Sequence, residues 1–454
     1  MSQVDERRVQ QVENLKDGFP VYQHPVKLLQ RLIRFDTTNP PGNEAPCIAF
    51  VRELLKEAGI ESSVLARAPE RPNLVARLKG RGAAPPLLLY GHVDVVSTEN
   101  QEWRYPPFEG TVAEGFVWGR GALDMKGGVA MMLAAFLRAK AENTALPGDV
   151  ILAVVSDEET TGDFGARFLV ENHPDLFEGA RYAIGECGGF SFYTGSKRFY
   201  PIMVAEKQRC AVRVTVRGQG GHGSMPVRGG AMARLSEVLR RLDTRRLPVH
   251  VTPTALAMID AIASTLGGTP GFILGRLKNP ALTNALLNLL GERGALFDPM
   301  LHNTVSPTIL RGSTTINVIP SEVSVDLDGR LLPGFSPDDL IAEIRGIVGD
   351  GAELEVLSYS PGPTEPDMGL FDTLSDILRE ADPEGVPVPL LLSATTDGRH
   401  FSRLGIQTYG FLPVQLPEAL NFIRTIHGAD ERIPVEGLGF GAEAIHTLLQ
   451  RFGG

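Results

Sequence analysis

The sequence predicts an α/β protein in which one domain is interrupted by a second, and three observations lead to this prediction. The chain has 454 residues, which is more than one hydrophobic core usually organises, so at least two domains are expected. Between residues 73 and 186, short apolar runs alternate with helical patterns, as in a sheet with helices on its faces. After Lys207, the strand pattern changes to alternating apolar and polar residues, which indicates a sheet with one solvated face.

The first domain is expected to contain strands that are buried on both faces. Residues 87–90 and 150–155 are apolar throughout, and residues 183–184 form a shorter apolar run. Runs of this kind, without alternation, are typical of the inner strands of a doubly wound sheet. The small and apolar residues 125–140 between the first two runs suit a packed helix.

The second domain is expected to follow the order β-α-β-β-α-β. Residues 210–217 and 323–328 alternate between apolar and polar side chains, as half-buried strands do. Ser336 precedes a proline and has an acidic residue three positions on, a pattern close to a capping box that predicts the start of a helix. A helix at 231–242 and a strand at 353–357 also fit this order.

These patterns set the expected domain boundaries. We expect the first domain to span residues 1–206 and to resume at residues 358–454, where apolar runs and a terminal helix return. The second domain would then occupy residues 207–357. Amphipathic helices at about residues 254–303 are expected to form an insert within it.

Composition and charge exclude several classes of protein. The net charge of −10 argues against nucleic-acid binding, which needs a basic surface. The three cysteines, Cys47, Cys187 and Cys210, are too few and too scattered for a disulfide framework. The longest apolar stretch, residues 127–137, is shorter than the roughly 18–20 residues that cross a bilayer, and residues 1–18 lack the apolar segment of a secretory signal. We therefore expect a cytoplasmic protein that binds no membrane.

Histidine and carboxylate side chains follow the expected strands, or open the expected helix, at four places. They are His92 with Asp94, Asp124, Glu158 with Glu159, and Glu186. Taken alone, each motif can be explained without a function, as a surface histidine, a solvated turn or a helix cap. Because ligands bind at the carboxyl ends of strands in open α/β sheets, four such motifs at one edge favour a shared site. Imidazole and carboxylate are ligands that zinc accepts.

The sequence resembles the M20 metallopeptidase family, which includes glutamate carboxypeptidase, aminoacylase, succinyl-diaminopimelate desuccinylase and acetylornithine deacetylase. The resemblance runs from about residue 26 to the C-terminus and rests on seven segments in the family's order. They are residues 90–96, 119–128, 156–159, 220–224, 316–320, 396–399 and 426–428. The resemblance implies a zinc-peptidase-like catalytic domain with a mixed central sheet, and an inserted lid domain that also serves for dimerisation.

The resemblance also assigns roles to residues of the first domain. The metal ligands would be His92, Asp124 and Glu186 for one ion, and Asp124, Glu159 and His427 for the other. Glu158 would be the general base, because a ligating carboxylate such as Glu159 has its lone pairs committed to the cation. Asp94 would accept the second ring N–H of His92 and so orient it. The ions are expected to be two Zn²⁺, with Co²⁺ or Mn²⁺ as alternatives.

Three residues of the second domain would act on the substrate. His222 would stabilise the oxyanion of the tetrahedral intermediate, although a histidine in a glycine-rich turn is the plain alternative. Arg330 would bind the substrate's α-carboxylate, with Asn317 at the same end, although a salt bridge to a neighbouring strand also explains Arg330. For Arg399, a structural ion pair with Asp397 is at least as reasonable as substrate contact.

We therefore expect a di-metal hydrolase that cleaves the amide bond of N-acyl amino acids or dipeptides next to a free carboxylate, and that forms a homodimer through the lid domain. An aminopeptidase would not need Arg330 or His222, and a non-catalytic homologue would have lost some of the site residues. Ester or carbamate hydrolysis on the same scaffold stays open.

The insert at 254–303 resembles the branch of vacuolar Gly-X carboxypeptidase and the secreted N-fatty-acyl-amino-acid hydrolases. This favours an apolar N-terminal part in the substrate. The apolar residues of the insert either pack the lid and a subunit interface, or line a pocket for that part.

Overall fold

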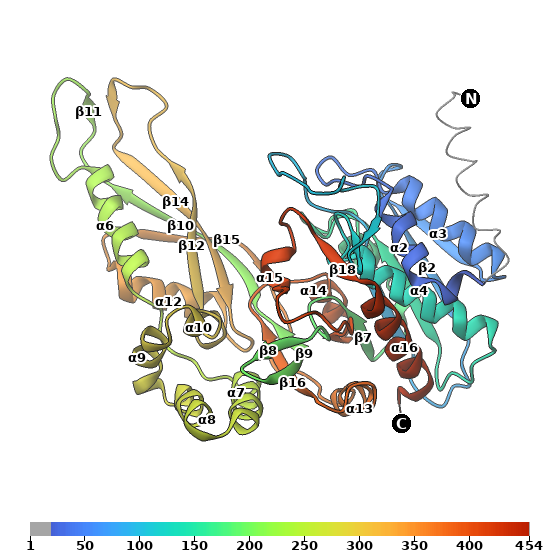
Figure 1. The fold of residues 1–454 in the computed structure, drawn as a ribbon. Helices are drawn as coiled ribbons and strands as arrows, with labels where there is room; N and C mark the ends of the chain where they lie inside the picture. The colour runs from blue at the N-terminus through green and yellow to red at the C-terminus, as the bar shows by residue number, and fades with distance from the viewer. Residues whose placement is uncertain (1–19, 454) are drawn as a thin grey trace. The chain divides into compact units, whose positions relative to one another are not determined.

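The computed structural model describes residues 20–453 and divides into two compact units (Figure 1). Unit 1 comprises the described residues up to 202 together with 368–387 and 403–453, and unit 2 comprises 203–367 and 388–402. The segment at residues 1–18, which we expect to lack a secretory signal, lies outside the described residues. Between residues 20 and 453, no helix has both the length and the apolar character needed to cross a bilayer.

A mixed sheet forms the centre of unit 1, with the strand order β1-β2-β6-β3-β7-β17-β9-β16 and β8 beside β9. Its strands are β1 (Ser62–Ala66), β2 (Pro72–Leu78), β3 (Leu87–His92), β6 (Val150–Val155), β7 (Tyr182–Gly185), β8 (Phe192–Thr194), β9 (Lys197–Glu206), β16 (Gly385–Leu392) and β17 (Gln407–Gly410). Strand β3 runs parallel to β6 and β7, and β7 runs parallel to β17, whereas β2 is antiparallel to β1 and β6. The predicted α/β fold with a mixed central sheet is therefore confirmed.

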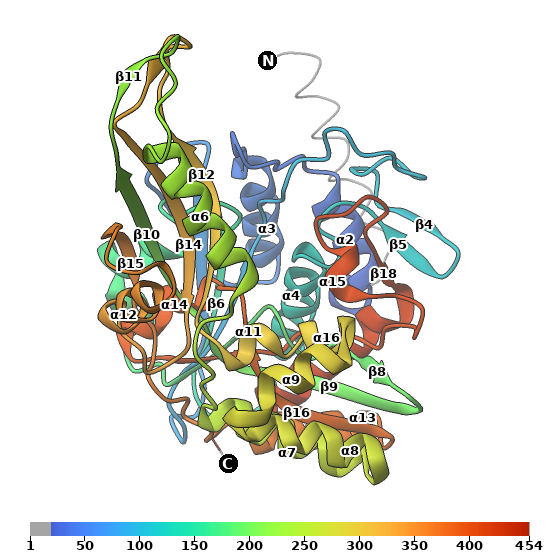
Figure 2. The same cartoon turned by 90° about the vertical axis from the view of Figure 1, so that its left-hand side faces the viewer.

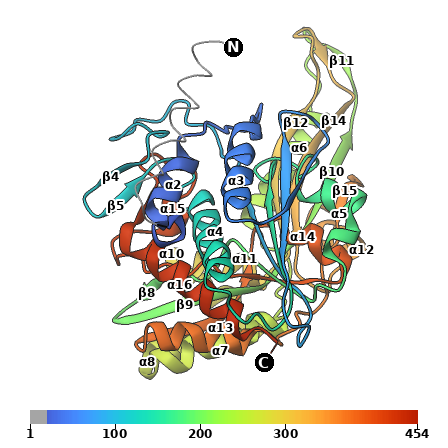
Figure 3. The same ribbon diagram turned by 90° about the vertical axis from the view of Figure 1, so that its right-hand side faces the viewer.

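The apolar runs of the sequence form the inner strands. Every residue of β3 and β6 is buried, as expected for unbroken apolar runs in the inner strands of a sheet. Helix α4 (Lys126–Ala141) packs on β3 and β6 and lies beside α2 (Pro25–Ile33) and α16 (Val435–Arg451) (Figure 3). Only a helix that is small and apolar nearly all round can be enclosed in this way.

The remaining elements of unit 1 are short helices and one small sheet. The sheet has the order β18-β5-β4, and its strands are β4 (Thr111–Ala113), β5 (Phe116–Trp118) and β18 (Arg432–Pro434). The helices are η2 (Val21–Gln23), α3 (Ala45–Glu57), α5 (Ala166–Asn172), η3 (Pro174–Phe177), α13 (Phe371–Ala381) and α15 (Phe422–Thr425), with η5 (Ser402–Leu404) at the boundary with unit 2.

Unit 2 is built on a four-stranded antiparallel sheet with the order β12-β14-β10-β15. Its strands are β10 (Gln208–Arg217), β12 (Thr304–Arg311), β14 (Glu322–Leu331) and β15 (Glu353–Ser360). Helices α6 (Ala231–Thr244) and α12 (Pro337–Val348) cover one face and bury the apolar positions of β10 and β14. The order along the chain is the predicted β-α-β-β-α-β, and α12 begins with a capping box between Ser336 and Asp339.

Two further features extend unit 2. A two-stranded arm, β11 (Gly221–His222) with β13 (Val318–Ile319), projects past the ends of β10 and β14 (Figure 2). The insert forms α7 (Pro253–Leu266), α8 (Gly268–Gly275), η4 (Arg276–Lys278), α9 (Pro280–Leu290), α10 (Glu292–Ala295) and α11 (Asp298–Leu301). One side of the insert is buried, as at Ile259, whereas Phe272 and Leu289 are mostly exposed.

The chain enters unit 2 a second time at residues 388–402, which include α14 (Gly398–Phe401). This return is not visible in the sequence, because β16 has the same apolar character as the strands of unit 1.

Candidate metal centre

The candidate site of unit 1 lies where parallel strands end. His92 is the last residue of β3, Glu186 follows β7, and Glu158 and Glu159 follow β6 by a short turn. Asp124 stands just before α4. Because β6, β3 and β7 are neighbours that run in the same direction, the side chains after them meet at one edge of the sheet.

The first cluster joins His92, Asp124 and Glu186. The Nε2 atom of His92 lies 3.2 Å from Oδ1 of Asp124 and 3.6 Å from Oε2 of Glu186. One ligand atom from each of the three residues lies within 4.8 Å of the others. His92 and Glu186 are buried. These are the three residues that the sequence analysis assigned to the first metal ion.

The second cluster joins Asp124, Glu159 and His427, and its ligand atoms also lie within 4.8 Å of one another. The Nε2 atom of His427 lies 3.1 Å from Oδ2 of Asp124 and 3.2 Å from Oε2 of Glu159. Asp124 thus turns one oxygen to each histidine, which is the arrangement that a bridging carboxylate requires.

The residues present fit a pair of cations. The Oε1 atom of Glu159 is buried and has no hydrogen-bond partner, although a buried carboxylate oxygen is costly to leave unsatisfied. Three carboxylates and two imidazoles are a ligand set typical of zinc and related divalent metals. Bound cations would satisfy the orphan oxygen and neutralise the acidic cluster.

Mutual pairing shifts the pKa values of these groups. Burial alone would lower the pKa of His92, but its hydrogen bonds to Asp124, Asp94 and Glu186 raise it well above the usual value. Hydrogen bonds to Asp124 and Glu159 raise the pKa of His427 to about 10. Burial and the negative charge of Asp124 raise the pKa of Glu159 to about 7. Without metal, protons therefore occupy the positions that cations would take.

Asp94 contacts three parts of the site at once. The Nδ1–H of His92 donates to the backbone carbonyl of Asp94 over 3.0 Å, and the Asp94 carboxylate lies 3.5 Å from the same nitrogen. This bond leaves Nε2 to face the cluster as a potential ligand. The carboxylate oxygens of Asp94 accept the backbone N–H groups of Glu158 and Glu159, each over 3.1 Å.

A second buried network supports Asp94 from behind. Asn39 donates to the carboxylates of Asp94 and Asp157 over 2.9 and 3.1 Å. Arg71 forms ion pairs with Asp157 and with Glu44, at 3.0 and 2.8 Å. All five residues are at least nine-tenths buried. The network fixes the turn after β6 that carries Glu158 and Glu159.

Glu431 supports the other side of the site and was missed by the sequence analysis. Its fully buried carboxylate accepts the backbone N–H groups of Gly121, Leu123 and Asp124 over 2.8 to 3.0 Å. It also pairs with buried Arg120 at 2.7 Å, and Arg120 donates to the backbone carbonyl of His427 over 3.2 Å. No local pattern marks a glutamate as buried, so the sequence carried no signal for this pair.

The residues that the resemblance assigned to substrate binding lie in unit 2. His222 is exposed on the two-stranded arm, and Asn317 lies beside it because its carbonyl accepts the N–H of Gly223 over 2.8 Å. The backbone N–H of Ser224 donates to Nδ1 of His222 over 3.2 Å. The proton of a neutral His222 ring therefore sits on Nε2, which can donate.

Arg330 belongs to a cationic cluster in unit 2. Its guanidinium pairs with both carboxylate oxygens of Asp328, two residues away on the same strand, at 3.1 and 3.0 Å. It also donates to the hydroxyl oxygen of Thr395 over 3.2 Å, and Arg399 donates to the same oxygen over 3.2 Å. Two guanidinium groups thus converge on one hydroxyl.

Known proteins share both the sequence pattern and the fold. The pattern of the peptidase family M20/M25/M40 matches residues 88–451. The human N-fatty-acyl-amino acid synthase/hydrolase PM20D1 is 27% identical over 380 residues, which cover 80% of this chain and 74% of the relative. The probable carboxypeptidase S-like 2 of Dictyostelium discoideum is 26% identical over 370 residues, which cover 77% of this chain and 68% of the relative.

A solved structure agrees with the fold. The crystal structure of human carnosine dipeptidase 1 matches with a TM-score of 0.66 and 15% identity, and the match covers 98% of each chain. At this identity the match shows the fold alone.

Proposed function

The chain belongs to the peptidase family M20/M25/M40, a family of hydrolases, and from this premise we propose that it is a di-zinc amide hydrolase. Its substrates are N-acyl amino acids or dipeptides, cleaved next to a free carboxylate. The observation that carries the proposal is the position of Asp124, which turns one oxygen towards His92 and the other towards His427.

In this proposal the two clusters of unit 1 hold the cations. His92, Asp124 and Glu186 hold one, and Asp124, Glu159 and His427 hold the other. When bound, two such cations polarise a scissile carbonyl and lower the pKa of a water to about 7.

Glu158 acts as the general base and then as the acid. It takes a proton from the attacking water and passes it to the leaving nitrogen, which departs as an amine. The location of Glu158 supports this role. The carboxylate of Asp94 accepts hydrogen bonds from the backbone N–H groups of both Glu158 and its neighbour Glu159, so one carboxylate positions the proposed base and the proposed ligand.

Unit 2 would recognise the charged end of the substrate and stabilise the transition state. Arg330, with Arg399 beside it, supplies positive charge for the α-carboxylate, and a guanidinium fork matches a carboxylate geometrically. Asn317 would contact the same end. His222 would donate from Nε2 to the oxyanion, in keeping with the hydrogen bond that its Nδ1 accepts.

A homodimer through unit 2 is part of the proposal. Strand β12 lies at an edge of the four-stranded sheet, and Ile309 and Leu310 on it are 49% and 64% exposed. A long edge strand with exposed apolar residues is suited to pairing with a second copy. Size-exclusion chromatography with light scattering, on the wild type and on Ile309→Lys, tests this part.

Three alternatives remain for the experiment to separate. They are an aminopeptidase, an ester or carbamate hydrolase, and a non-catalytic homologue. The zinc-loaded protein should be analysed for metal per chain and then assayed on N-acyl amino acids, dipeptides, amino-acid amides and matched esters. The proposal expects two metal ions per chain and turnover of substrates that carry a free carboxylate. Turnover of amino-acid amides alone would favour an aminopeptidase, and the absence of any turnover would favour a non-catalytic role.

A further inference from the structure

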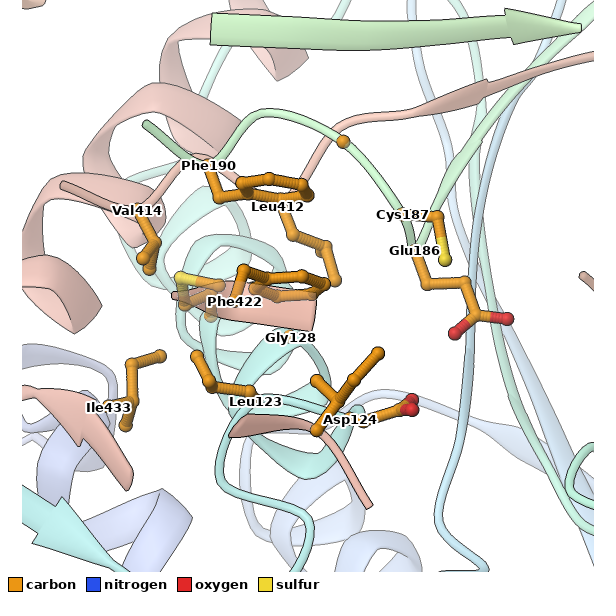
Figure 4. Close-up of a pocket in the computed structure, with 13 residues that line it drawn as sticks. Leu123, Asp124, Gly128, Glu186, Cys187, Phe190, Leu412, Val414, Phe422 and Ile433 are labelled. Atoms are coloured by element: carbon orange, nitrogen blue, oxygen red, sulfur yellow. The ribbon is translucent and has the colours of Figure 1, made fainter. Parts of the chain in front are cut away.

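An apolar pocket adjoins the candidate metal centre. It is lined by residues of unit 1 alone, among them Asp124 and Glu186. Figure 4 shows these two carboxylates at one side of the pocket and apolar side chains over the rest of it. The pocket therefore opens directly onto the atoms that are proposed to hold the first cation.

The chemistry of the lining limits what can bind. Apart from the two proposed metal ligands, it consists of aliphatic, aromatic, glycine, methionine and cysteine residues, and no lysine, arginine or histidine is among them. A substrate carboxylate turned into the pocket, away from the proposed cation, would find no cationic side chain there. An uncharged apolar group suits the lining, because burying it removes apolar surface from water on both sides.

Two stacked aromatic rings form one wall of the pocket. The rings of Phe190 and Phe422 lie 4.0 Å apart and are nearly parallel, at 6°, and Figure 4 shows them layered across the pocket. Phe190 follows β7, and Phe422 begins α15. Both are only partly buried, so this wall faces solvent on its outer side.

The size of the pocket sets a limit on length. Its volume is about 30 Å³. Since one water-sized group needs roughly 10–15 Å³ by this measure, the pocket admits roughly two or three such groups, or an acyl chain of roughly three or four carbons. Further carbon atoms would have no room inside the pocket.

We propose that this pocket binds the acyl side of the substrate and selects short, unbranched apolar acyl groups such as propionyl and butyryl. The inference rests on the proposed function, since it takes the metal centre as the place where the amide is cut. It assigns the acyl group to unit 1 and not to the apolar residues of the insert. Phe422 is then a specificity-determining residue.

The test uses zinc-loaded protein and two series of compounds. The first is straight-chain carboxylates from acetate to octanoate, whose affinity is measured by calorimetry. The second is the same acyl groups on one amino acid, whose kcat/KM is measured. We expect affinity and kcat/KM to rise about three- to fourfold per methylene up to propionyl or butyryl and to fall beyond.

Two variants should move this optimum in opposite directions. Phe422→Ala removes one of the stacked rings and should shift the optimum to longer chains. Val414→Leu adds a methylene to a lining residue and should shift it to shorter ones. Phe192→Ala is the matched control, because Phe192 also stacks on another ring, Phe199, at 5.3 Å but does not line the pocket. It should leave the optimum in place.

The outcomes separate this inference from the proposed function. Carboxylates that peak at a short length and shift with the variants would support the pocket even if no N-acyl amino acid is hydrolysed, in which case the proposed function fails alone. Hydrolysis with a flat profile, or with a profile that rises through octanoyl, would overturn the pocket and leave the function standing. An optimum that neither variant moves would also overturn it.

Discussion

The backbone N–H of Asp124 donates to Oε1 of Glu431 over 3.0 Å. This bond fixes the residue that stands between the two candidate ligand histidines to a carboxylate that has no solvent exposure. Arg120 completes the link, since it pairs with Glu431 and also reaches the carbonyl of His427. The buried ion pair between Arg120 and Glu431 therefore links Asp124 to His427, although these two residues are far apart in the sequence.

We predict that Glu431→Gln lowers the affinity for metal by roughly 10–100-fold, as changes behind metal ligands commonly do. The amide loses one of the two acceptor oxygens and leaves the charge of Arg120 buried without its partner. Metal affinity is measured by competition with a chelator. Glu443→Gln, which removes an exposed partner of Arg138, is the control. A lower Tm with unchanged metal affinity would reduce Glu431 to a purely structural role.

Replacement of the proposed base should separate metal binding from turnover. Glu158→Gln should keep both metal ions and reduce kcat by about 10²–10⁴-fold, because only the transfer of a proton is lost. Elemental analysis and steady-state kinetics on the same preparation provide the measurement. Near-normal turnover with full metal content would rule out Glu158 as the base.

The structure brings the residues of the two predicted clusters together, and the sequence could indicate this because their signal is local. A buried strand followed by His92, or by Glu158 and Glu159, can be recognised in a few residues, and the direction of the strands brings their ends together. Glu431, Arg120 and Asn39 could not be found in this way. Their importance arises from burial and from partners up to 311 positions away, which no short pattern encodes.

The same reasoning explains what the sequence indicated about unit 2. The alternation in β10 and β14 and the capping box at Ser336 are local patterns, and the structure contains both. The pairing of Arg330 with Asp328, on its own strand, was not foreseen. The strand alternation indicates that both side chains lie on the same face of the strand. It does not indicate that Arg330 pairs with Asp328 and not with a residue of a neighbouring strand.

Metal binding should release protons at neutral pH. The pKa of His427 is raised to about 10 and that of His92 well above its usual value, so both rings are protonated in the metal-free protein at pH 7. Both must lose a proton to coordinate. Affinity for metal should therefore rise with pH up to about 10. Glu159, whose pKa is raised to about 7, is partly protonated at pH 7 and must also lose its proton. Calorimetry in buffers of different ionisation enthalpy should therefore detect about two to three protons released, and the absence of release would contradict histidine ligation.

Recognition of the substrate carboxylate should depend on Arg330. Arg330→Gln should lower kcat/KM for substrates with a free carboxylate by at least about 30-fold, the effect of about 2 kcal/mol that loss of one partner of a buried charge pair typically has. The matching amides should change little. Arg213→Gln is the control, because Arg213 also pairs with a carboxylate, Asp326, in the same sheet. Equal losses of kcat/KM on acids and amides would show that Arg330 only pairs with Asp328 and does not bind the substrate carboxylate.

The last prediction concerns His222, whose exposed ring lies on the two-stranded arm of unit 2. His222→Ala should lower kcat far more than it changes KM, because a hydrogen bond to an oxyanion forms mainly in the transition state. If the arm of one subunit serves the metal centre of the other in the proposed homodimer, mixing His222→Ala with Glu158→Ala subunits should restore activity, since some mixed dimers then contain one complete site. The restored fraction should approach one quarter of the wild-type rate at equal mixing, about half the dimers being mixed with one of two sites intact. Recovery far below this value, in a mixture shown to exchange subunits, would place His222 in the site of its own chain. A change confined to KM would make it a binding contact and not a stabiliser of the oxyanion.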